Sequence, residues 1–338
     1  MASYQILKWC FYLACLVHFV ILFRHVRFHW KTGYWHWKNE LSRQDKIRLK
    51  HLLLTRRYPW EPNAIEVARY RAELEQCCNA SFQLVLTKEN TPLGSNISCL
   101  EDNIKIAVEA ELIKLLPETS PFSQSQYKNC AVVGNGGTLR NSNCGHEIDQ
   151  ADLVVRFNLP PMNFSEDVGT KTSLITINPS ILKNKFHHLL AEQKPFADAL
   201  GLYRDALIFL PIFTHSHNSD VGYRVMHTIE RFGLAQKAFF LNPQYQANLK
   251  NYWRNKNLQP NRLSSGFIFL SMALEFCQRI TLYGFWPFLH DLNNQPIPHH
   301  YYDNKLPDDN VHDMPIEFSL YLHMYAQNVL LLQYGKCQ

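Results

Sequence analysis

Three histidines and a glutamate gather in one polar stretch near the carboxyl end of the chain. His299 and His300 are adjacent, His312 follows, and Glu317 comes five positions later. Histidine exchanges protons near neutral pH more readily than other side chains, so one of these groups could act as a general base. Zinc ligation is the alternative, but adjacent His299 and His300 should point apart and no cysteine lies at a metal-ligand spacing. The stretch therefore favours proton transfer over metal binding.

A glycine-rich segment follows a short apolar run at residues 131–133. The sequence GNGG at 134–137 would let the backbone turn tightly and approach a ligand, although a tight turn alone also explains these glycines. Asn135 lies among them and Asn158 ends the next apolar run. Two neutral amides can hydrogen-bond an anionic ligand without repelling it. The dinucleotide fingerprint is not met, because its third glycine would fall at Leu139 and no acidic residue closes the second run.

Two serines and a glycine precede another candidate site. Ser264, Ser265 and Gly266 come directly before an apolar stretch of helical length. Hydroxyls and free amides at a helix start can bind an anion, although an ordinary serine N-cap explains the same residues. No Asp-x-Asp triplet occurs that could hold a divalent ion against a diphosphate. The sequence therefore favours a metal-independent transfer from a monophosphate-type donor.

These candidates follow short apolar runs that are separated by stretches of helical length. The runs span residues 131–133, 153–157, 174–177, 206–210, 238–241 and 280–283. Such spacing is typical of βα units, which build a mostly parallel sheet. Because ligands of such sheets gather beyond the carboxyl ends of the strands, we expect the chemistry in the loops that follow these runs. Residues 24–120 are more polar and indicate a stem, with a Pro- and Ser-rich linker at 117–126.

The composition excludes some classes of protein. With 46% hydrophobic and 19% charged residues, the chain has the balance of a globular protein and not of a disordered one. Its net charge of +5 is mild and its Lys and Arg residues are scattered, so nucleic-acid binding is not expected. An anionic small molecule is compatible with this charge.

The amino-terminal region contains one candidate membrane span. Residues 9–23 lack Asp, Glu, Lys and Arg, which suits a short anchor, and no small-residue site for signal-peptide cleavage follows. Lys8 precedes the span, whereas Arg24, Arg27 and Lys31 follow it. By the positive-inside tendency, this charge distribution alone would place the rest of the chain in the cytosol.

Sequons and cysteines indicate the opposite orientation. Sequons occur at Asn79, Asn96 and Asn163, and seven cysteines lie beyond the span, which suits an oxidising, glycosylating compartment. The cysteines form an even set in the strand-rich part and an odd set in the stem: Cys130, Cys144, Cys277 and Cys337, then Cys77, Cys78 and Cys99. Spacing leaves all three pairings of the even set open. One stem thiol is left over, either buried or available for a covalent homodimer.

Four ordered motifs together resemble the animal sialyltransferases, and within them the α2,8-sialyltransferase branch. Residues from Cys130 to about Ser180 are similar to the large sialylmotif of that family, and Asn261 to Phe285 to the small one. The sequence HHYYDN at His299 resembles the third motif, and the spacing from His312 to Glu317 resembles the very short one. The likeness covers roughly residues 78–337, and four motifs in order are far more specific than one.

The resemblance implies a fold, a donor and a location. The donor would be CMP-sialic acid, with no cofactor and no metal, and the fold a variant Rossmann-like, GT-A-type α/β domain. The protein would be a single-pass type II Golgi membrane enzyme, which decides the orientation against the flanking charges. The implied parts are a cytoplasmic tail at 1–8, a transmembrane signal anchor at 9–23, a lumenal stem at 24–120 and a catalytic domain at 121–338.

The resemblance also assigns roles to the candidates. His312 would be the general base, and His300 would stabilise the departing phosphate. The donor-binding residues would be Asn135, Asn158, Ser264, Ser265, Gly266, Trp286, His299 and His300. The implied disulfides are Cys130–Cys277 and Cys144–Cys337. Ser265 stands where the family usually has threonine and Phe157 where it usually has cysteine, and neither change removes a ligand.

The acceptor is inferred from local likeness. Polysialyl-forming members carry a strongly basic stretch before the small motif, which residues 237–262 lack. The segments at 76–82, 90–98, 282–288 and 299–307 are most similar to type VI members, which add one sialic acid to sialylated O-glycans of glycoproteins. The ganglioside-forming types I and V are close alternatives. A non-catalytic Golgi protein that binds glycan or CMP-sugar is disfavoured by the intact histidines, and a dehydrogenase by the missing third glycine.

Overall fold

The computed structural model describes residues 40–56, 59–122, 126–191, 193–258, 262–305 and 312–337. The predicted tail at 1–8 and the predicted anchor at 9–23 lie outside these residues. Within the described part of the chain, none of the helices is both long and apolar enough to cross a membrane.

A seven-stranded sheet forms the centre of the structure, and every neighbouring pair of its strands is parallel. In the order β7-β6-β5-β4-β3-β8-β9, the strands are Lys237–Phe240, Leu207–Leu210, Leu174–Thr176, Leu153–Phe157, Tyr127–Val133, Cys277–Tyr283 and Leu331–Gln333. All six apolar runs in the sequence are confirmed as strands, and the structure adds β9. Cys130 of β3 pairs with Leu153 of β4 on one side and with Ile280 of β8 on the other.

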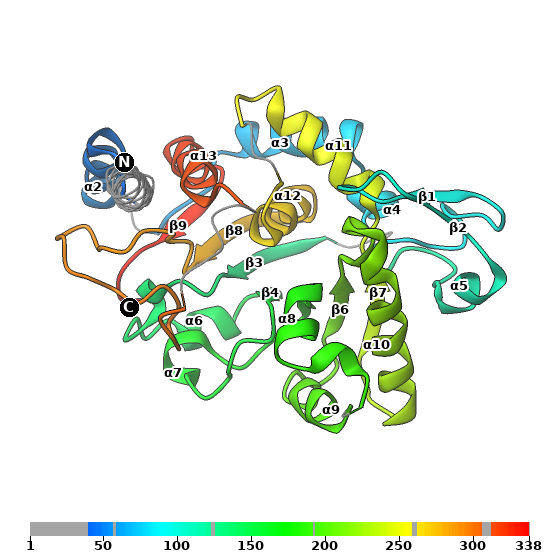
Figure 1. Ribbon diagram of the computed structural model, residues 1–338. Helices are drawn as coiled ribbons and strands as arrows, with labels where there is room; N and C mark the ends of the chain where they lie inside the picture. The colour runs from blue at the N-terminus through cyan, green and yellow to red at the C-terminus, as the bar shows by residue number, and fades with distance from the viewer. Residues whose placement is uncertain are drawn as a thin grey trace, which may run out of the picture.

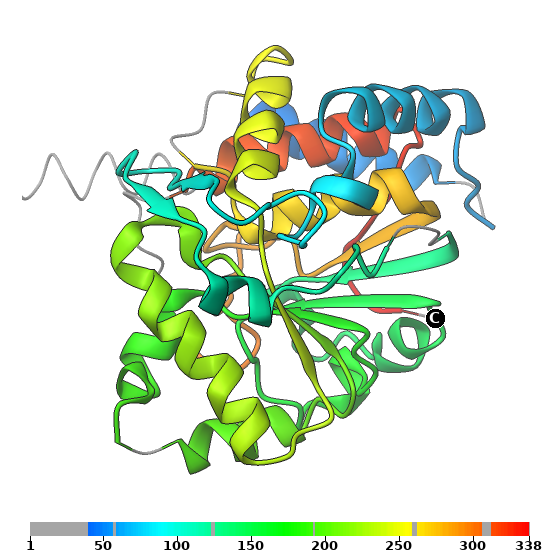
Figure 2. The same ribbon diagram turned by 90° about the vertical axis from the view of Figure 1, so that its right-hand side faces the viewer.

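Helices cover both faces of the sheet, which gives an α/β/α arrangement (Figures 1 and 2). One face carries α3 (Ala64–Cys77), α11 (Pro243–Arg254), α12 (Ser265–Phe276) and α13 (Met314–Ala326), with α2 (Arg43–Thr55) packed on α13. The other carries α6 (Gly145–Asp149), α7 (Ser165–Val168), α8 (Pro179–Asn184), α9 (Lys194–Gly201) and α10 (Ser219–Arg231). Val132 and Val155 point into one apolar core, whereas Val133 and Val154 point into another. This alternation explains why the strands read as continuous apolar runs.

The segment expected as a stem is largely part of this folded body. Helix α3 buries Val67, Tyr70 and Leu74 in the core that also contains α12. The Arg71 guanidinium donates to the carbonyl oxygens of Glu275 and Cys277, at 2.9 and 2.7 Å. The boundary expected at residue 120 therefore does not mark where folded structure begins. The sequence indicated helix α3. It did not show that α12, which packs on the sheet, would cover the apolar side of α3.

Shorter elements complete the same segment. They are α4 (Ala80–Gln83), α5 (Ala110–Leu115) and a two-stranded antiparallel sheet of β1 (Asn96–Ser98) and β2 (Lys105–Ala107). Asn96 on β1 and Asn163 before α7 are exposed, and half-buried Asn79 caps α4 by accepting a hydrogen bond from the Phe82 amide. Glycosylation at these three residues stays a prediction.

Three disulfides connect distant and adjacent parts of the chain. Cys130–Cys277 joins β3 to β8, and Cys144–Cys337 joins the start of α6 to the segment after β9, so both implied pairings are confirmed. Cys77 pairs with its neighbour Cys78. Among the described residues, the one cysteine outside these disulfides is Cys99, and it is buried. Of the two alternatives for the leftover stem thiol, the structure therefore has the buried one.

Candidate active site

The candidate residues meet in one cleft at the carboxyl ends of the strands. The cleft has a volume of about 1150 Å³ and lies where the strand order reverses, between β3 and β8. Ligands of open parallel sheets bind at such a switch point. The structure brings all the predicted site residues to its walls: Asn135, Asn158, Ser264, Ser265, Gly266, Trp286, His299, His300 and His312. A space of this size accommodates more than one small ligand.

The glycine-rich segment is explained by the close approach of two strand exits. The amides of Gly134 and Gly136 donate to the carbonyl oxygens of Tyr283 and Gly284, at 2.8 and 2.9 Å. A Cβ added at Gly136 would lie 2.4 Å from the Gly284 oxygen, closer than any side chain can sit. The glycines therefore let the loops after β3 and β8 continue side by side into the cleft, with Asn135 held between them.

An asparagine follows each of three neighbouring strands, β3, β4 and β5. The Asn135 side-chain amide donates to the carbonyl oxygen of Phe157 at 3.1 Å, and its buried Oδ1 has no hydrogen-bond partner among the described residues. Asn158 Oδ1 accepts from the backbone amide of Asn178, whose own Oδ1 accepts from the Ser265 hydroxyl. The Asn135 oxygen is thus an acceptor available to an N–H or O–H group of a ligand.

Sequence reasoning missed Asn178, which links the end of β4 to helix α12. Its signal was present, because Asn178 follows the apolar run 174–177 just as Asn158 follows 153–157. The proline at 179 also marked it as a helix N-cap position, and it precedes α8 in the structure. A polar residue at a third strand end could therefore have been added to the predicted set.

Helix α12 points its amino terminus into the cleft and is fastened there by a buried carboxyl. The Ser264 hydroxyl accepts from the Phe267 amide at 3.1 Å and donates to Glu317 Oε2 at 2.5 Å. The Ser264 amide donates to Glu317 Oε1 at 2.7 Å. Burial raises the pKa of Glu317 to about 7, against the opposing effect of these hydrogen bonds. The Ser264 hydroxyl thus serves the helix cap and Glu317 rather than standing free for a ligand.

Replacing Ser264 with alanine should destabilise the protein by about 1 kcal/mol, because the helix loses its capping oxygen. Among the described residues, the neighbouring Ser265 hydroxyl donates to Asn178 and caps no helix, so Ser265→Ala is the matched control. We expect a lower thermal midpoint for Ser264→Ala and a much smaller change for Ser265→Ala. Equal midpoints for the two variants would contradict the capping role.

His312 is held in the form of a proton acceptor. Its Nδ1 lies 3.1 Å from the carbonyl oxygen of Arg262. A carbonyl oxygen only accepts, so this bond places the proton on Nδ1 and leaves Nε2 with a free lone pair. Burial lowers the pKa of His312, and the positive charge of Arg262 acts in the same direction. The imidazole is therefore neutral near pH 7 and suited to accept a proton from a substrate hydroxyl.

His299 and His300 lie against the glycine-rich segment. Their rings meet edge to face, with centroids 4.5 Å apart, so the expectation that they point apart is wrong. His300 Nδ1 lies 2.7 Å from Asp303 Oδ1, and its ring stacks on Tyr302. Burial, with a contribution from the His300 charge, lowers the pKa of His299 to about 4. The backbone of His299 and His300 is bound to the glycine-rich segment at Gly137 and Gly136.

Trp286 forms a wall of the cleft by packing. Only 5% of its surface is exposed, and its indole N–H donates to the carbonyl oxygen of His290 at 3.0 Å. Its ring contacts Phe288 and Phe318 at centroid distances of 5.1 and 5.4 Å. The indole N–H is therefore engaged within the protein, and Trp286 presents apolar surface to the cleft.

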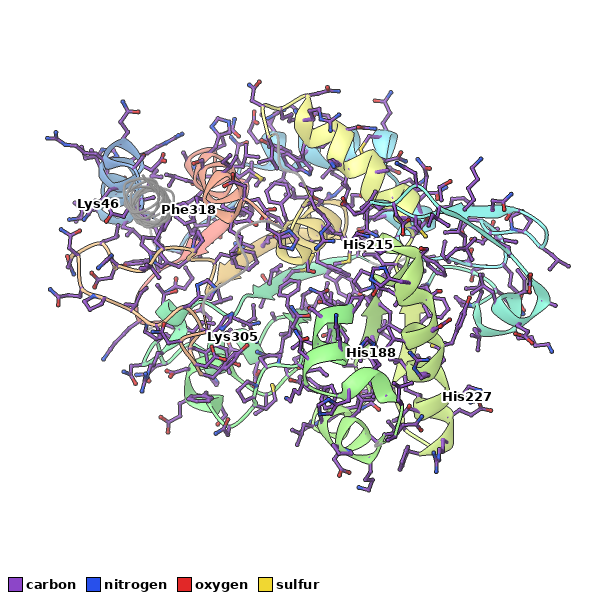
Figure 3. All side chains as sticks on the ribbon, in the orientation of Figure 1. Lys46, His188, His215, His227, Lys305 and Phe318 are labelled. Atoms are coloured by element: carbon purple, nitrogen blue, oxygen red, sulfur yellow. A yellow bond between two sulfur atoms is a disulfide. The ribbon has the colours of Figure 1, made fainter. Side chains whose placement is uncertain are left out.

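Positive charge dominates the cleft walls. The cationic side chains among the lining residues are Lys183, Lys185, Arg262 and Lys305, and the acidic ones are Asp303 and Glu317. Lys305 comes from the loop after β8 (Figure 3). Burial lowers the pKa of Arg262, but an arginine stays cationic at any physiological pH. Sequence reasoning gave no role to Arg262, because nothing in its spacing showed that its carbonyl oxygen would orient His312.

Comparison with known proteins gives consistent matches. A profile of glycosyltransferase family 29 (sialyltransferase) matches residues 84–329. The alpha-2,8-sialyltransferase 8F of Homo sapiens is 41% identical over 283 residues, which cover 83% of this chain and 71% of the human protein. The alpha-N-acetylneuraminide alpha-2,8-sialyltransferase of Xenopus tropicalis is 39% identical over 282 residues, covering 82% and 81%. A crystal structure of a mammalian sialyltransferase with Gal-beta-1-3GalNAc-ortho-nitrophenol aligns over 88% of both chains, at 20% identity and a TM-score of 0.45.

Proposed function

Because the chain belongs to glycosyltransferase family 29, the sialyltransferases, we propose that it transfers sialic acid from CMP-sialic acid to a terminal sialic acid, forming an α2,8 linkage. The observation that carries this proposal is the neutral His312 with a free Nε2 in a cationic cleft. Both substrates are anionic, since the donor has a phosphate and a carboxylate and the acceptor has a carboxylate. The relatives whose names state α2,8 transfer support the linkage.

The acceptor side of the reaction is served by His312. Its Nε2 accepts the proton of the attacking hydroxyl as the new bond to the anomeric carbon forms. The Arg262 carbonyl oxygen keeps the Nδ1 proton and so fixes the tautomer and the ring orientation. The Arg262 guanidinium is half-buried in the same wall. Attack from the side opposite the departing CMP inverts the anomeric centre.

The donor side is served by groups that stabilise the negative charge of the departing phosphate. Helix α12 presents its amino terminus, which carries partial positive charge and free amides. His300 would donate a hydrogen bond from Nε2 to the phosphate as an imidazolium, since Asp303 Oδ1 accepts the Nδ1 proton and orients the ring. Asn135, Asn158, Ser265, Gly266 and His299 would complete the donor site. Groups aimed at charge that develops in the transition state contribute most to such a reaction.

For the acceptor we propose sialylated O-glycans of glycoproteins, with one or a few sialic acids added. The sequence segments similar to type VI members support this choice. Gangliosides are the second candidate, on the similarity to types I and V. The absence of a strongly basic stretch within 237–262 argues against long polymers.

The remaining expectations concern the domain type, the location of the protein in the cell, its requirements for activity and its association. The domain would be a variant Rossmann-like glycosyltransferase of the GT-A type, anchored in the Golgi membrane by residues 9–23 with its catalytic part in the lumen. Transfer would need neither metal nor cofactor. The chain would carry N-glycans, and it would form homodimers without help from Cys99, whose thiol is buried.

The test is an assay of the purified chain with CMP-sialic acid, with and without EDTA. The acceptors are a sialylated O-glycoprotein, a sialylated ganglioside and their desialylated forms. We expect α2,8-linked product on the sialylated O-glycoprotein, equal rates with and without chelator, and no product on the desialylated forms. Transfer to the desialylated forms alone would overturn the linkage, and CMP-sialic acid binding without any transfer would favour a non-catalytic protein.

The pH dependence of this transfer should show a base that works in mildly acidic solution. Protonation removes the lone pair of His312, so kcat/KM falls as pH drops through the pKa of this residue, which burial places below 6.5. We expect the midpoint of this decline to lie below pH 6.5. Rates measured between pH 4.5 and 8 give the profile. A midpoint at or above pH 6.5 would contradict a base with a lowered pKa.

A further inference from the structure

A cluster of two imidazoles and one carboxylate lies in the cleft wall, outside the residues given a role above. The candidate ligand atoms of Asp102, His215 and His217 all lie within 4.8 Å of one another. The His215 and His217 rings are nearly parallel, with centroids 5.3 Å apart. Neither ring is hydrogen-bonded to any described residue. Their nitrogens are therefore available, and both residues line the cleft.

The backbone fixes the position of these ligands. The amides of Leu100 and Glu101 donate to the carbonyl oxygens of Phe213 and Thr214, at 3.1 and 2.9 Å. These bonds join the turn before Asp102 to the segment before His215. Ser216 donates to Asp102 Oδ2 through both its amide and its hydroxyl, at 2.8 Å each.

Asp102 is held from a second direction. The amide of Ile104 donates to Asp102 Oδ1 at 3.2 Å. Because Ser216 lies between the two histidines, its bonds to Asp102 bring both imidazoles to the carboxylate. These contacts explain the position of the carboxylate, but they leave the imidazoles without partners.

We propose that Asp102, His215 and His217 form a zinc-binding site in the wall of the cleft. Two imidazole nitrogens and one carboxylate oxygen are a ligand set that suits Zn²⁺ and leaves a fourth position for water or a substrate oxygen. Magnesium and calcium prefer oxygen ligands and fit this set poorly. Zinc–ligand distances of about 2.0–2.1 Å require the atoms to approach one another by roughly an ångström or more. Rotation of the exposed His217 ring can supply this movement.

The ion would lie on the side of the cleft that holds the base. Glu101 is adjacent to Asp102 in the chain, and its carboxylate interacts electrostatically with both Arg262 and His312. A divalent cation here would add positive charge beside the acceptor position and make proton uptake by His312 less favourable. Zinc is thus an inhibitor of transfer in this proposal, and this consequence rests on the proposed function, whereas zinc binding itself does not.

The test of the site measures zinc binding to the full chain, prepared without a histidine tag, by competition with a chromogenic chelator. Wild type should bind one zinc more than His217→Ala, or bind it at least 100-fold more tightly. Losing a residue that merely hydrogen-bonds a metal ligand lowers metal affinity roughly 10–100-fold, and losing the ligand itself should cost more. Cobalt(II) should give the visible spectrum of a tetrahedral site in wild type and not in the variant. His227→Ala is the control, because His227 is an exposed histidine of α10 away from His215 (Figure 3). Equal zinc affinity for wild type and His217→Ala would overturn the site.

The inhibition is tested separately on transfer rates. Zinc at concentrations that fill the site should slow wild type and His227→Ala by at least tenfold and leave His217→Ala at its zinc-free rate. Magnesium at the same concentration should slow none of them. Equal zinc inhibition of all three proteins would overturn the inhibitory role. A chain that binds zinc through His217 but shows no transfer in the absence of zinc would contradict the proposed function and leave the site intact.

Discussion

His312→Ala is expected to lower kcat by about 10²–10⁴-fold, the usual contribution of a general base. The variant keeps the donor-binding groups, because the His312 ring is hydrogen-bonded to none of them and, among the described residues, only to the Arg262 carbonyl oxygen. Affinity for CMP, measured by calorimetry, should therefore stay within a few-fold of wild type. A loss of kcat without a loss of donor affinity is what distinguishes a base from a binding residue.

Controls separate this role from a general effect of removing a histidine. His323 is exposed on α13, the helix that follows His312, and His323→Ala should retain wild-type kcat. The acidic limb of the pH profile should also disappear from any residual activity of His312→Ala. Turnover at a tenth of the wild-type rate or more would remove His312 from the role of base.

Gly136→Ala should produce the second large effect, through geometry alone. The backbone of Gly136 has ordinary negative φ, so alanine meets no conformational penalty there. Its Cβ, however, would lie 2.4 Å from the Gly284 carbonyl oxygen, the same oxygen that accepts the Gly136 amide hydrogen. The Gly284 oxygen belongs to the backbone and the Cβ is fixed to its own Cα, so neither atom can rotate away. The loops after β3 and β8 must separate, which moves Asn135 and His300 at once.

We expect Gly136→Ala to weaken CMP binding at least tenfold and to destabilise the fold by about 1–3 kcal/mol, the usual cost of overpacking. Gly201→Ala is the matched control, because no atom lies within 4 Å of its added Cβ and its φ is ordinary. Calorimetry with CMP and thermal unfolding check both effects. Unchanged CMP affinity in Gly136→Ala would show that the two loops do not form the donor site.

The pattern of apolar residues predicted most strands of the central sheet. Each predicted run became a strand because strands buried on both faces must be apolar at successive positions, and Val132 and Val133 illustrate this. Strand β9 escaped detection because Leu331–Gln333 is short and lies in a wider apolar stretch with α13. The sequence did not show that α3 would join the folded body, because no local pattern indicates that Tyr70 packs on Trp253, a residue far away in the sequence.

The sequence indicated which residues line the candidate site, but not which contacts these residues make. Polar residues after apolar runs indicated Asn135 and Asn158, and the four motifs supplied the histidines. The sequence could not show that Ser264 would be engaged by Glu317, or that the Arg262 carbonyl oxygen would set the tautomer of His312. Such contacts depend on the exact placement of loops, which three-dimensional packing decides. The disulfide pairing also came from family likeness, since spacing allowed three arrangements.

The two long-range disulfides can form only after their second cysteine has been synthesised. Cys130 and Cys277 are separated by 147 residues, and Cys144 and Cys337 by 193. At roughly 5–20 residues per second, a ribosome needs about 7–30 s to add Cys277 after Cys130. During that interval, Cys130 and Cys144 can meet each other or the earlier cysteines of the chain, among them Cys77, Cys78 and Cys99. Strands β4 to β7 lie between the two cysteines of each bond, so neither long-range disulfide can form until these four strands have been synthesised.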